Sequence, residues 1–505
     1  MGSPAGGFAF QLARARAAHA AGDLATALDA LQQALRLEPR HAELWTGMAE
    51  LLHDLGREVD AQAAIEHALA LAPGDRAALL FASMIANGLG DAAKAESILR
   101  QLLVAQPFDS AARANLASLL ERGNRHDDAE REAREGLKSA PHEPLLNLVV
   151  AQCAFHRRDL DSCEMFLGRI RGATGLIPQH AAYLAAQMLD GRGRPAEAYA
   201  AFASANRIAA TNSARIGIDP ARSLAQLVAE LGIFSDEWVS GWAPLEAPTP
   251  LPFTPAFLVG FPRSGTTLLE QILDSHPGVA ALDEKAFLED QFNASGVDYP
   301  WGLAALAPVE RESLRAGYAA SVLRYRPEAA GRVVVDKYPL KLARVGAIHR
   351  LFPEARYIFA LRHPYDVVLS CFMQEFGANP AMANFFTLDG AARYYDAAMA
   401  LWERHRAQHP LAVVTVRYEA LVDDLESQVR PALEHLGLGW DARVEGFASH
   451  ALGRGWIRTP SYQQVSQGLY TSARARFTKY LSHFSAEARA LLDPWVARHG
   501  YAPVD

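Results

Sequence analysis

The residues best suited to chemistry form a short loop, Phe-Pro-Arg-Ser-Gly-Thr-Thr, at positions 261–267. An apolar run precedes the loop and a stretch with helical periodicity follows it, so the loop is predicted to join a strand to a helix N-terminus. Backbone N–H groups and the helix dipole favour an anion at such a turn. Gly265 allows the backbone to approach closely, and Arg263 supplies a charged fork. Further hydroxyl donors come from Ser264, Thr266 and Thr267.

This loop differs from the nucleotide-binding loop of kinases and ATPases at one decisive position. Gly260 and Gly265 have the GxxxxG spacing, but Thr266 stands where GK[ST] requires a lysine. Those enzymes use that lysine and Mg²⁺ to bind the terminal phosphates. The run Val333–Asp336 does imitate their acidic Walker B strand. A P-loop kinase or NTPase therefore remains the less favoured alternative.

A second predicted strand end also carries an anion-binding pattern. The apolar run Tyr357–Leu361 predicts a buried strand, and Arg362 follows it directly. Pro364 and Asp366 suit the first turn of a following helix. A strand-end arginine beside a helix start is a plausible second site for an anion, and a structural ion pair is the alternative.

Together these residues resemble the sulfotransferases that use 3′-phosphoadenylyl sulfate (PAPS). Arg263–Thr267 looks like their 5′-phosphosulfate-binding loop. The segment Leu273–Pro277 and the acidic pair after it are similar to the tyrosylprotein sulfotransferase branch. The resemblance covers about Phe257–Phe484, roughly half of the chain. It implies a P-loop-like α/β domain with a parallel sheet, PAPS as donor, 3′,5′-phosphoadenosine as product, and no metal.

The resemblance also implies which residues hold the 3′-phosphate of the donor. In this family an arginine leaving a strand and a serine eight residues later bind it, and Arg362 and Ser370 have this spacing. Gln374 stands where a further arginine is expected, which leaves one phosphate contact open.

Further donor contacts are implied for Tyr418, at the end of another apolar run, and for Ser461 and Arg476 in a C-terminal segment. Arg474 and Lys479 lie close to Arg476 in the sequence and could take its role, or the three could form a solvated cationic face.

Sulfuryl transfer to a hydroxyl requires a base, stabilisation of the SO₃ oxygens and neutralisation of the departing phosphate. The resemblance implies Glu284, the second residue of the acidic pair, as the general base. Asp283 is the next candidate, and His276 is the third, because cytosolic sulfotransferases use a histidine. Lys337, after an apolar run, is implied to stabilise the leaving group together with Arg263.

The half of the chain before this domain repeats with a period of 34 residues. Prolines recur at Pro39, Pro73, Pro107 and Pro141. Alanines recur at Ala27, Ala61, Ala95 and Ala129. Turn-forming residues recur at Gly22, Gly56, Gly90 and Asn124. This register resembles the tetratricopeptide repeat, in which small residues let paired helices approach and proline ends the second helix.

We therefore expect an α-solenoid over residues 8–210, with four clear and two degenerate repeats. A helical connector and proline-rich linker at 211–255 separate it from the sulfotransferase domain at 256–505. The concave surface of such an array is expected to bind a protein or peptide substrate, and a rigid spacer or oligomerisation module is the alternative.

Composition and charge exclude several classes of binding partner and site. The net charge of −8 argues against a general binder of nucleic acid or anionic membranes. Cys153, Cys163 and Cys371 have neither disulfide-framework nor zinc-site spacing, and no secretory or membrane-spanning pattern is present. A cytoplasmic enzyme is expected. Its acceptor is expected to be a protein or peptide hydroxyl, with tyrosine as one candidate. A glycan or small-molecule hydroxyl is the alternative, and a scaffold with an inactive transferase domain is a further one.

Overall fold

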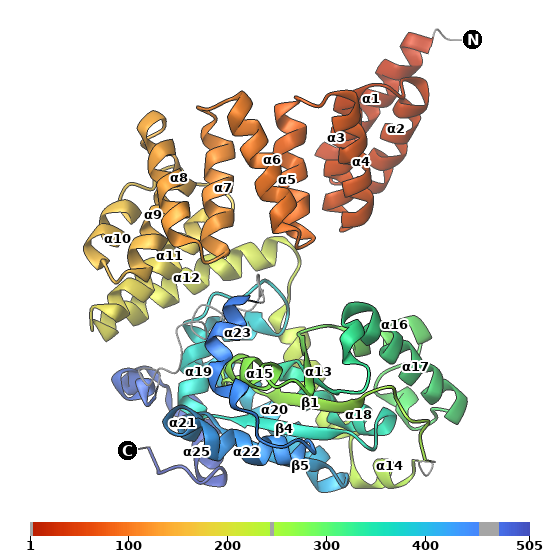
Figure 1. Cartoon of the computed structure of the whole chain (residues 1–505), viewed down its shortest axis with the longest axis vertical. Coiled ribbons are helices and arrows are strands. Elements are labelled where there is room, and N and C mark those ends of the chain that lie inside the picture. The colour runs from red at the N-terminus through yellow and green to blue at the C-terminus, as the bar shows by residue number, and fades with distance from the viewer. Residues whose placement is uncertain (1–3, 243–246, 454–473, 505) are drawn as a thin grey trace. The chain divides into compact units, whose positions relative to one another are not determined.

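The structure, a computed structural model, describes residues 4–242, 247–453 and 474–504. The chain divides into two compact units, Met1–Ala181 and Ala182–Asp505. The first unit consists of packed helix pairs, and the second of a parallel sheet with helices on both faces (Figure 1). Among the helices in the described ranges, none combines the length and apolar character needed to cross a bilayer.

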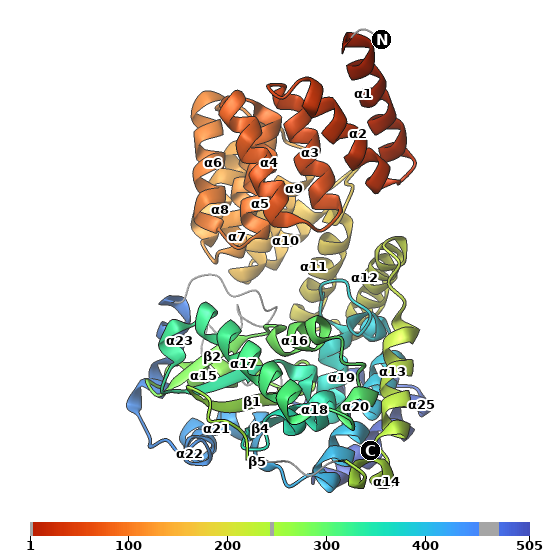
Figure 2. The same cartoon turned by 90° about the vertical axis from the view of Figure 1, so that its right-hand side faces the viewer.

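The first unit is a succession of helix, turn and helix in which neighbouring helices pack against each other; Figure 2 shows α3–α8 lying side by side. Its helices are α1 (Pro4–Ala20), α2 (Leu24–Leu37), α3 (Ala42–Asp54), α4 (Glu58–Leu71), α5 (Arg76–Gly88), α6 (Ala92–Ala105), α7 (Ser110–Arg122), α8 (His126–Ser139), α9 (Pro144–His156), α10 (Leu160–Leu167) and the start of α11 (Ile177–Gly191).

The 34-residue register has a structural cause in the turns and in the helix contacts. The turn residue has a positive φ in each repeat: 76° at Gly22, 72° at Gly56, 90° at Gly90 and 60° at Asn124. Arg158 takes the same conformation in the fifth repeat. The recurring alanines Ala27, Ala61, Ala95 and Ala129 are all buried. A larger side chain there would separate the paired helices.

The helix α12 (Pro195–Arg215) packs with the second unit, although the repeat pattern in the sequence extends to about residue 210. Its buried residues Phe202 and Ala205 belong to the same hydrophobic core as the sheet. Asn206 donates from Nδ2 to the carbonyl of Phe372 at 3.0 Å. The division between the compact units therefore falls inside α11.

The second unit is built on five parallel strands in the order β2-β3-β1-β4-β5. The strands are β1 (Thr254–Gly260), β2 (Val279–Asp283), β3 (Val333–Lys337), β4 (Arg356–Leu361) and β5 (Ala412–Arg417). Its other helices are α13 (Pro220–Ile233), α14 (Asp236–Ser240), α15 (Thr266–Asp274), α16 (Phe287–Ser295), α17 (Pro308–Tyr325), α18 (Val345–Leu351), α19 (Pro364–Phe372), α20 (Leu388–Gln408), α21 (Tyr418–Asp423), α22 (Leu425–His435), α23 (Phe447–Gly453) and α25 (Ala486–Arg498). Short 3₁₀ helices are η1 (Trp301–Leu303), η2 (Pro327–Ala329), η3 (Pro339–Arg344), η4 (Met382–Phe386), η5 (Ala442–Gly446) and η6 (Arg476–His483).

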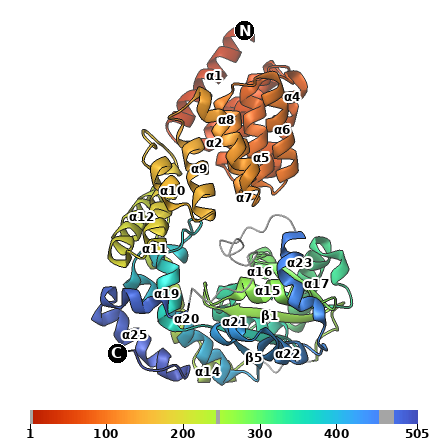
Figure 3. The same ribbon diagram turned by 60° about the vertical axis from the view of Figure 1, so that its left-hand side comes forward.

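Helices cover both faces of this sheet, and the strand sequences reflect it. Phe257 and Val259 of β1 pack into one hydrophobic core together with α18, α20 and α25. Ala256 and Leu258, which alternate with them, pack into a second core with α15 and α22. Figure 3 shows α15 lying along the sheet beside α23. Burial on both faces explains why the strands are almost continuously apolar. The predicted fold class, an α-solenoid followed by a parallel α/β domain, is confirmed.

Candidate active site

The candidate site lies at the carboxyl ends of the strands, where ligands bind in open parallel sheets. After β1 the chain turns sharply into α15, with φ of 71° at Arg263 and 91° at Gly265. A Cβ atom on Gly265 would lie 2.7 Å from the Tyr418 ring, so only glycine fits this turn. The hydroxyl residues Ser264, Thr266 and Thr267 are all buried around the start of α15.

Four predicted donor-binding residues meet beside this turn, and we refer to Arg263, Arg362, Ser370 and Tyr418 as the anion cluster. Arg263 donates from Nε to Ser370 Oγ at 3.1 Å. Arg362 donates from Nη1 to the carbonyl oxygen of Arg263 at 3.0 Å, and its guanidinium lies 4.8 Å from the centre of the Tyr418 ring. Residues that follow β1, β4 and β5 are thus brought to one place by the strand order.

The C-terminal segment 475–477 is tied to α19 through Asp366. The Asp366 carboxylate accepts hydrogen bonds from the backbone N–H groups of Ala475 at 2.8 Å and Phe477 at 2.9 Å. The side chain of Arg476 between them forms an ion pair with Asp190 at 2.6 Å. Its donor contact therefore stays a prediction.

The C-terminal segment contains three other residues that the sequence offers as donor contacts, namely Arg474, Lys479 and Ser461. Arg474, the alternative to Arg476, forms an ion pair with Asp423 at 2.6 Å. The side chain of Lys479 is exposed on η6. Ser461 lies outside the described residues.

A second group, which we call the lysine cluster, surrounds the ammonium of Lys337 at the end of β3. Lys337 Nζ lies 3.3 Å from a Glu270 oxygen, 2.8 Å from Asp283 Oδ1 and 2.7 Å from Glu284 Oε1. Burial lowers the pKa of Lys337, but the three carboxylates raise it well above its ordinary value. A buried ammonium needs such partners, because an unpaired buried charge is very costly.

Glu270 is the functional candidate that the sequence did not reveal. It lies on α15, where every residue is buried, and its own side chain is completely buried against Lys337. The signal was present in the sequence, because a carboxylate interrupts the apolar run Leu268–Leu273. Such a residue on a buried helix needs a cationic partner, and Glu270 thereby positions Lys337.

Glu284 differs from the other two carboxylates in its exposure. Its side chain is 40% exposed, whereas that of Asp283 is 15% exposed and that of Glu270 is buried. Its backbone has a left-handed φ of 42°, and its N–H donates to the Lys337 carbonyl at 3.0 Å. This unusual conformation turns Glu284 out of the strand while keeping it on Lys337. Glu284 is thus the most solvent-accessible carboxylate of the lysine cluster.

His276 lies just before the start of β2, at the amino ends of the strands, whereas Lys337 lies at their carboxyl ends. Its Nδ1 accepts a hydrogen bond from the N–H of Gly278 at 3.0 Å, and its Nε2 lies 3.1 Å from the carbonyl oxygen of Gly439. Both ring nitrogens are therefore engaged by backbone groups, one before β2 and one after α22. The structure brings Asp283 and Glu284 to Lys337, but it does not bring His276 there.

Asp336, which imitates a Walker B residue, also has its own buried partners. Its two carboxylate oxygens accept hydrogen bonds from Lys341 Nζ at 2.9 and 2.8 Å. The hydroxyl of Tyr318 donates to the same carboxylate at 3.0 Å. This carboxylate is already neutralised by an ammonium, which differs from the task of holding Mg²⁺ in an NTPase.

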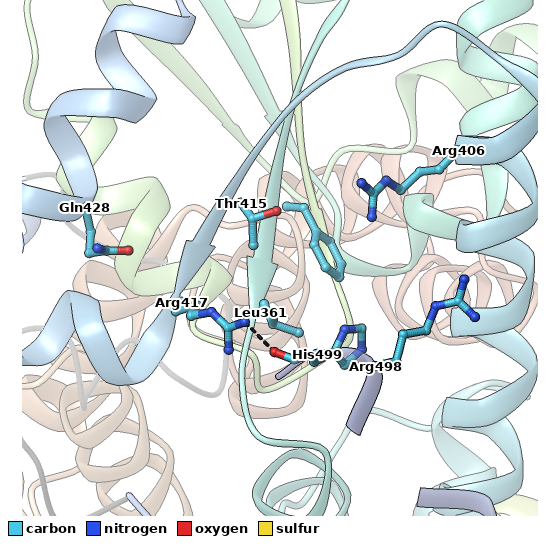
Figure 4. Close-up of a pocket in the computed structure, with 8 residues that line it drawn as sticks. Leu361, Arg406, Thr415, Arg417, Gln428, Arg498 and His499 are labelled. Atoms are coloured by element: carbon cyan, nitrogen blue, oxygen red, sulfur yellow. Dashed lines mark hydrogen bonds between the residues drawn. The ribbon is translucent and has the colours of Figure 1, made fainter. Parts of the chain in front are cut away.

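A cavity of about 450 Å³ lies elsewhere, on the side of β4 and β5 that α20 and α25 cover (Figure 4). Its cationic lining residues are Arg406, Arg417 and Arg498. Arg406 and Arg498 share the carboxylate of Glu403, and Arg417 donates to the carbonyl of His499. The residues that line it include neither the anion cluster nor the lysine cluster. This cavity is therefore separate from the two clusters at the strand ends.

Models of two protein families match two separate parts of the chain. Residues 255–442 match the model of the sulfotransferase family. Residues 18–85, 82–144 and 114–162 match models of the tetratricopeptide repeat.

Among curated relatives, an uncharacterized protein of Aquifex aeolicus is 30% identical over 45% of this chain and 30% of its own length. Nodulation protein NoeE of Sinorhizobium fredii is 28% identical over 38% of this chain and 51% of its own length. Protein-tyrosine sulfotransferase A of Caenorhabditis elegans is 25% identical over 37% of this chain and 51% of its own length. The chain thus spans about half or less of each of these relatives. It carries a domain of the sulfotransferase family behind an array of tetratricopeptide repeats.

Proposed function

We propose that the second unit transfers a sulfuryl group from PAPS to a hydroxyl of a protein or peptide. The observation that carries this proposal is the presence of two clusters at the same edge of one sheet. The anion cluster offers two guanidinium groups and a hydroxyl next to a helix N-terminus. The lysine cluster, at the adjoining strand ends, offers an ammonium and a reachable carboxylate.

The residues present fit the charges of PAPS. The turn at Arg263–Thr267 and the start of α15 would hold its phosphosulfate, because N–H groups at a helix start favour anions. Arg362 and Ser370 would hold its 3′-phosphate, and the Tyr418 ring would lie against the nucleotide. Three anionic groups on one small ligand require this density of donors.

The transfer step uses Glu284 as the base for the acceptor hydroxyl and Lys337 as the cation that stabilises the leaving oxygen. The acceptor oxygen forms a bond to sulfur while Glu284 takes the hydroxyl proton. The bond between sulfur and the bridging oxygen breaks, and its electron pair goes to the phosphate of 3′,5′-phosphoadenosine. Once protonated, Glu284 no longer holds the ammonium of Lys337 by charge. Lys337 can then stabilise the departing oxygen, as electrostatic catalysis requires.

The acceptor part of the proposal rests on the repeats and on a relative. Tetratricopeptide repeats generally bind proteins, and one relative is a protein-tyrosine sulfotransferase. Tyrosine in a peptide is therefore the acceptor we propose, with a glycan or small-molecule hydroxyl as the alternative. We also propose a reducing, cytoplasmic setting, which the three free and buried cysteines support.

Calorimetric titration of the full chain tests the donor. We expect 3′,5′-phosphoadenosine to bind without Mg²⁺ and ATP·Mg²⁺ to bind far more weakly. The change Arg362→Gln should weaken the binding of 3′,5′-phosphoadenosine by at least about tenfold, because a hydrogen bond to a charged group contributes about 1.5–3 kcal/mol. Arg406→Gln, which removes an arginine from the separate cavity, is the matched control and should bind normally. Tight binding of ATP·Mg²⁺ alone would identify a nucleotide kinase or NTPase instead.

A further inference from the structure

Three side chains that are common metal ligands meet in the first unit, far in sequence from the sulfotransferase domain. Glu121 lies near the end of α7, His126 begins α8 and His156 ends α9, and these helices pack against one another (Figures 1 and 3). One ligand atom from each side chain lies within 4.8 Å of the other two. The members of this group come from three different helices, which helix packing brings together.

The two ring nitrogens of His126 are arranged as in a metal-bound histidine. His126 Nε2 lies 2.7 Å from Asn124 Oδ1, an oxygen that can only accept, so this nitrogen carries the proton. His126 Nδ1 then holds the lone pair, and this buried atom has no hydrogen-bond partner within the described part of the chain. Metal-bound histidines typically donate their other N–H to such an oxygen.

The side chains of Glu121 and His156 lie beside His126, and one ligand atom of each lies within 4.8 Å of one ligand atom of His126. His156 Nε2 lies 3.3 Å from Glu121 Oε1, and the rings of His126 and His156 stack with their centres 4.2 Å apart. Glu121 is only 4% exposed. A nearly buried carboxylate beside two imidazoles is stabilised by a bound cation. Tetrahedral ligands at zinc distances lie roughly 3.4 Å apart, close to the 3.3 Å between His156 Nε2 and Glu121 Oε1.

The repeat register explains how the cluster arises. A side chain at one position contacts the residue five positions later, as His53 contacts Glu58 at 2.8 Å. The same position also contacts the residue 35 positions later, as His19 contacts Asp54 at 3.4 Å. The His53–Glu58 pair has the spacing of five residues, and the His19–Asp54 pair has the spacing of 35 residues.

Glu121 uses both spacings, because His126 follows it by five residues and His156 by 35. His53 and Glu58 occupy the positions that correspond to Glu121 and His126. The position that corresponds to His156 is Gly88, at the end of α5. Two of the three corresponding positions therefore carry a ligand side chain, and the third does not.

We propose that Glu121, His126 and His156 bind a divalent transition-metal ion of the zinc type. Two imidazoles and one carboxylate suit zinc, and three protein ligands leave a fourth position to water. The ion joins α7, α8 and α9 and so fastens the fourth repeat to the fifth. The fifth repeat, whose second helix α10 has only eight residues, has the shortest helix of the array to pack on its neighbour. This role is independent of sulfuryl transfer.

Titration of the full, metal-free chain with Zn²⁺ tests the site. We expect one binding event in calorimetry, and Co²⁺ at the same site should give the visible absorption of tetrahedral coordination. Glu121→Gln and His156→Gln should each weaken binding by more than about tenfold. His142→Gln, which removes an exposed histidine of the same unit, should bind as the unchanged chain does. Equal binding by His156→Gln and the unchanged chain, or no binding at all, would overturn the proposal.

A gain of binding provides a test that does not depend on a destabilised variant. Gly88 ends α5 as His156 ends α9, it is exposed, and a Cβ atom added there meets nothing within 4 Å. The change Gly88→His completes the set with His53 and Glu58. We expect the stoichiometry of Co²⁺ binding to rise from one to two. A stoichiometry that stays at one contradicts the site geometry on which the proposal rests.

Discussion

At the scale of single residues, Lys337 organises the candidate site. Its ammonium is buried among Glu270, Asp283 and Glu284. The sequence resemblance indicated Lys337 and the acidic pair because they follow recognisable strands. It did not indicate Glu270, because the partner of a buried carboxylate becomes visible only when α15 packs on the sheet.

Replacing Lys337 should destabilise the fold as well as stop turnover. Lys337→Met leaves three carboxylates around an apolar side chain, and removing one partner of a buried ion pair costs about 3–5 kcal/mol. Urea unfolding of the full chain, followed by tryptophan fluorescence, measures this loss. Lys479→Met, which changes an exposed lysine, is the control and should stay within about 0.5 kcal/mol of the unchanged chain. Equal stability of the two variants would show that the Lys337 contacts contribute little.

At the scale of elements, the turn between β1 and α15 decides where an anion can bind. The sequence predicted the strand, the turn and the helix, since apolar runs and glycine report on local backbone. The family resemblance implied Tyr418 as a donor contact, but the sequence could not predict that the Tyr418 ring packs against Gly265. That contact depends on the placing of β4 between β1 and β5, which is a property of the whole sheet.

Enlarging Gly265 should weaken donor binding. Gly265→Ala places a methyl group 2.7 Å from the Tyr418 ring at a φ of 91°, so the turn or the ring must move. We expect the dissociation constant of 3′,5′-phosphoadenosine to rise by at least about tenfold, which corresponds to about 1.4 kcal/mol. Gly439→Ala, where a Cβ atom meets nothing within 4 Å, is the control. Unchanged binding by Gly265→Ala would mean that the donor does not use this turn.

The packing of α20 should make the stability of the second unit sensitive to acid. Burial lowers the pKa of His405 to about 3, with a smaller contribution from His409. The unfolded chain binds a proton near pH 6.5 and the folded chain does not, so stability is full above pH 6.5 and falls as the pH decreases toward 3. Each pH unit in this window costs about 1.4 kcal/mol for this group.

Urea unfolding between pH 7 and pH 4 measures this slope. His405→Leu should be less stable at pH 7, because the ring packs against Phe234 with centres 4.6 Å apart. Its stability should nevertheless decrease less steeply with falling pH than that of the unchanged chain. Parallel curves for the two proteins would place the acid sensitivity in other residues.

At the scale of the whole molecule, the chain combines a repeat unit with a sulfotransferase-family unit. The 34-residue period was readable because each repeat needs the same turn and the same small residue. The division between units was harder to read, because α12 continues the helical pattern but is buried in the core of the second unit. Sequence periodicity predicts that a segment is helical. Which unit the helix packs against depends on tertiary contacts, which the periodicity does not predict.

We propose that the carboxyl ends of these strands transfer a sulfuryl group with Glu284 as the base. The most direct measurement is transfer of ³⁵S from labelled PAPS to a tyrosine-containing peptide by the full chain. We expect Glu284→Gln to bind 3′,5′-phosphoadenosine normally and to lose about 10²–10⁴-fold in turnover. Asp283→Asn, which keeps Glu284, should lose far less. Normal turnover by Glu284→Gln, or no transfer from PAPS by the unchanged chain to any hydroxyl acceptor, would contradict this account.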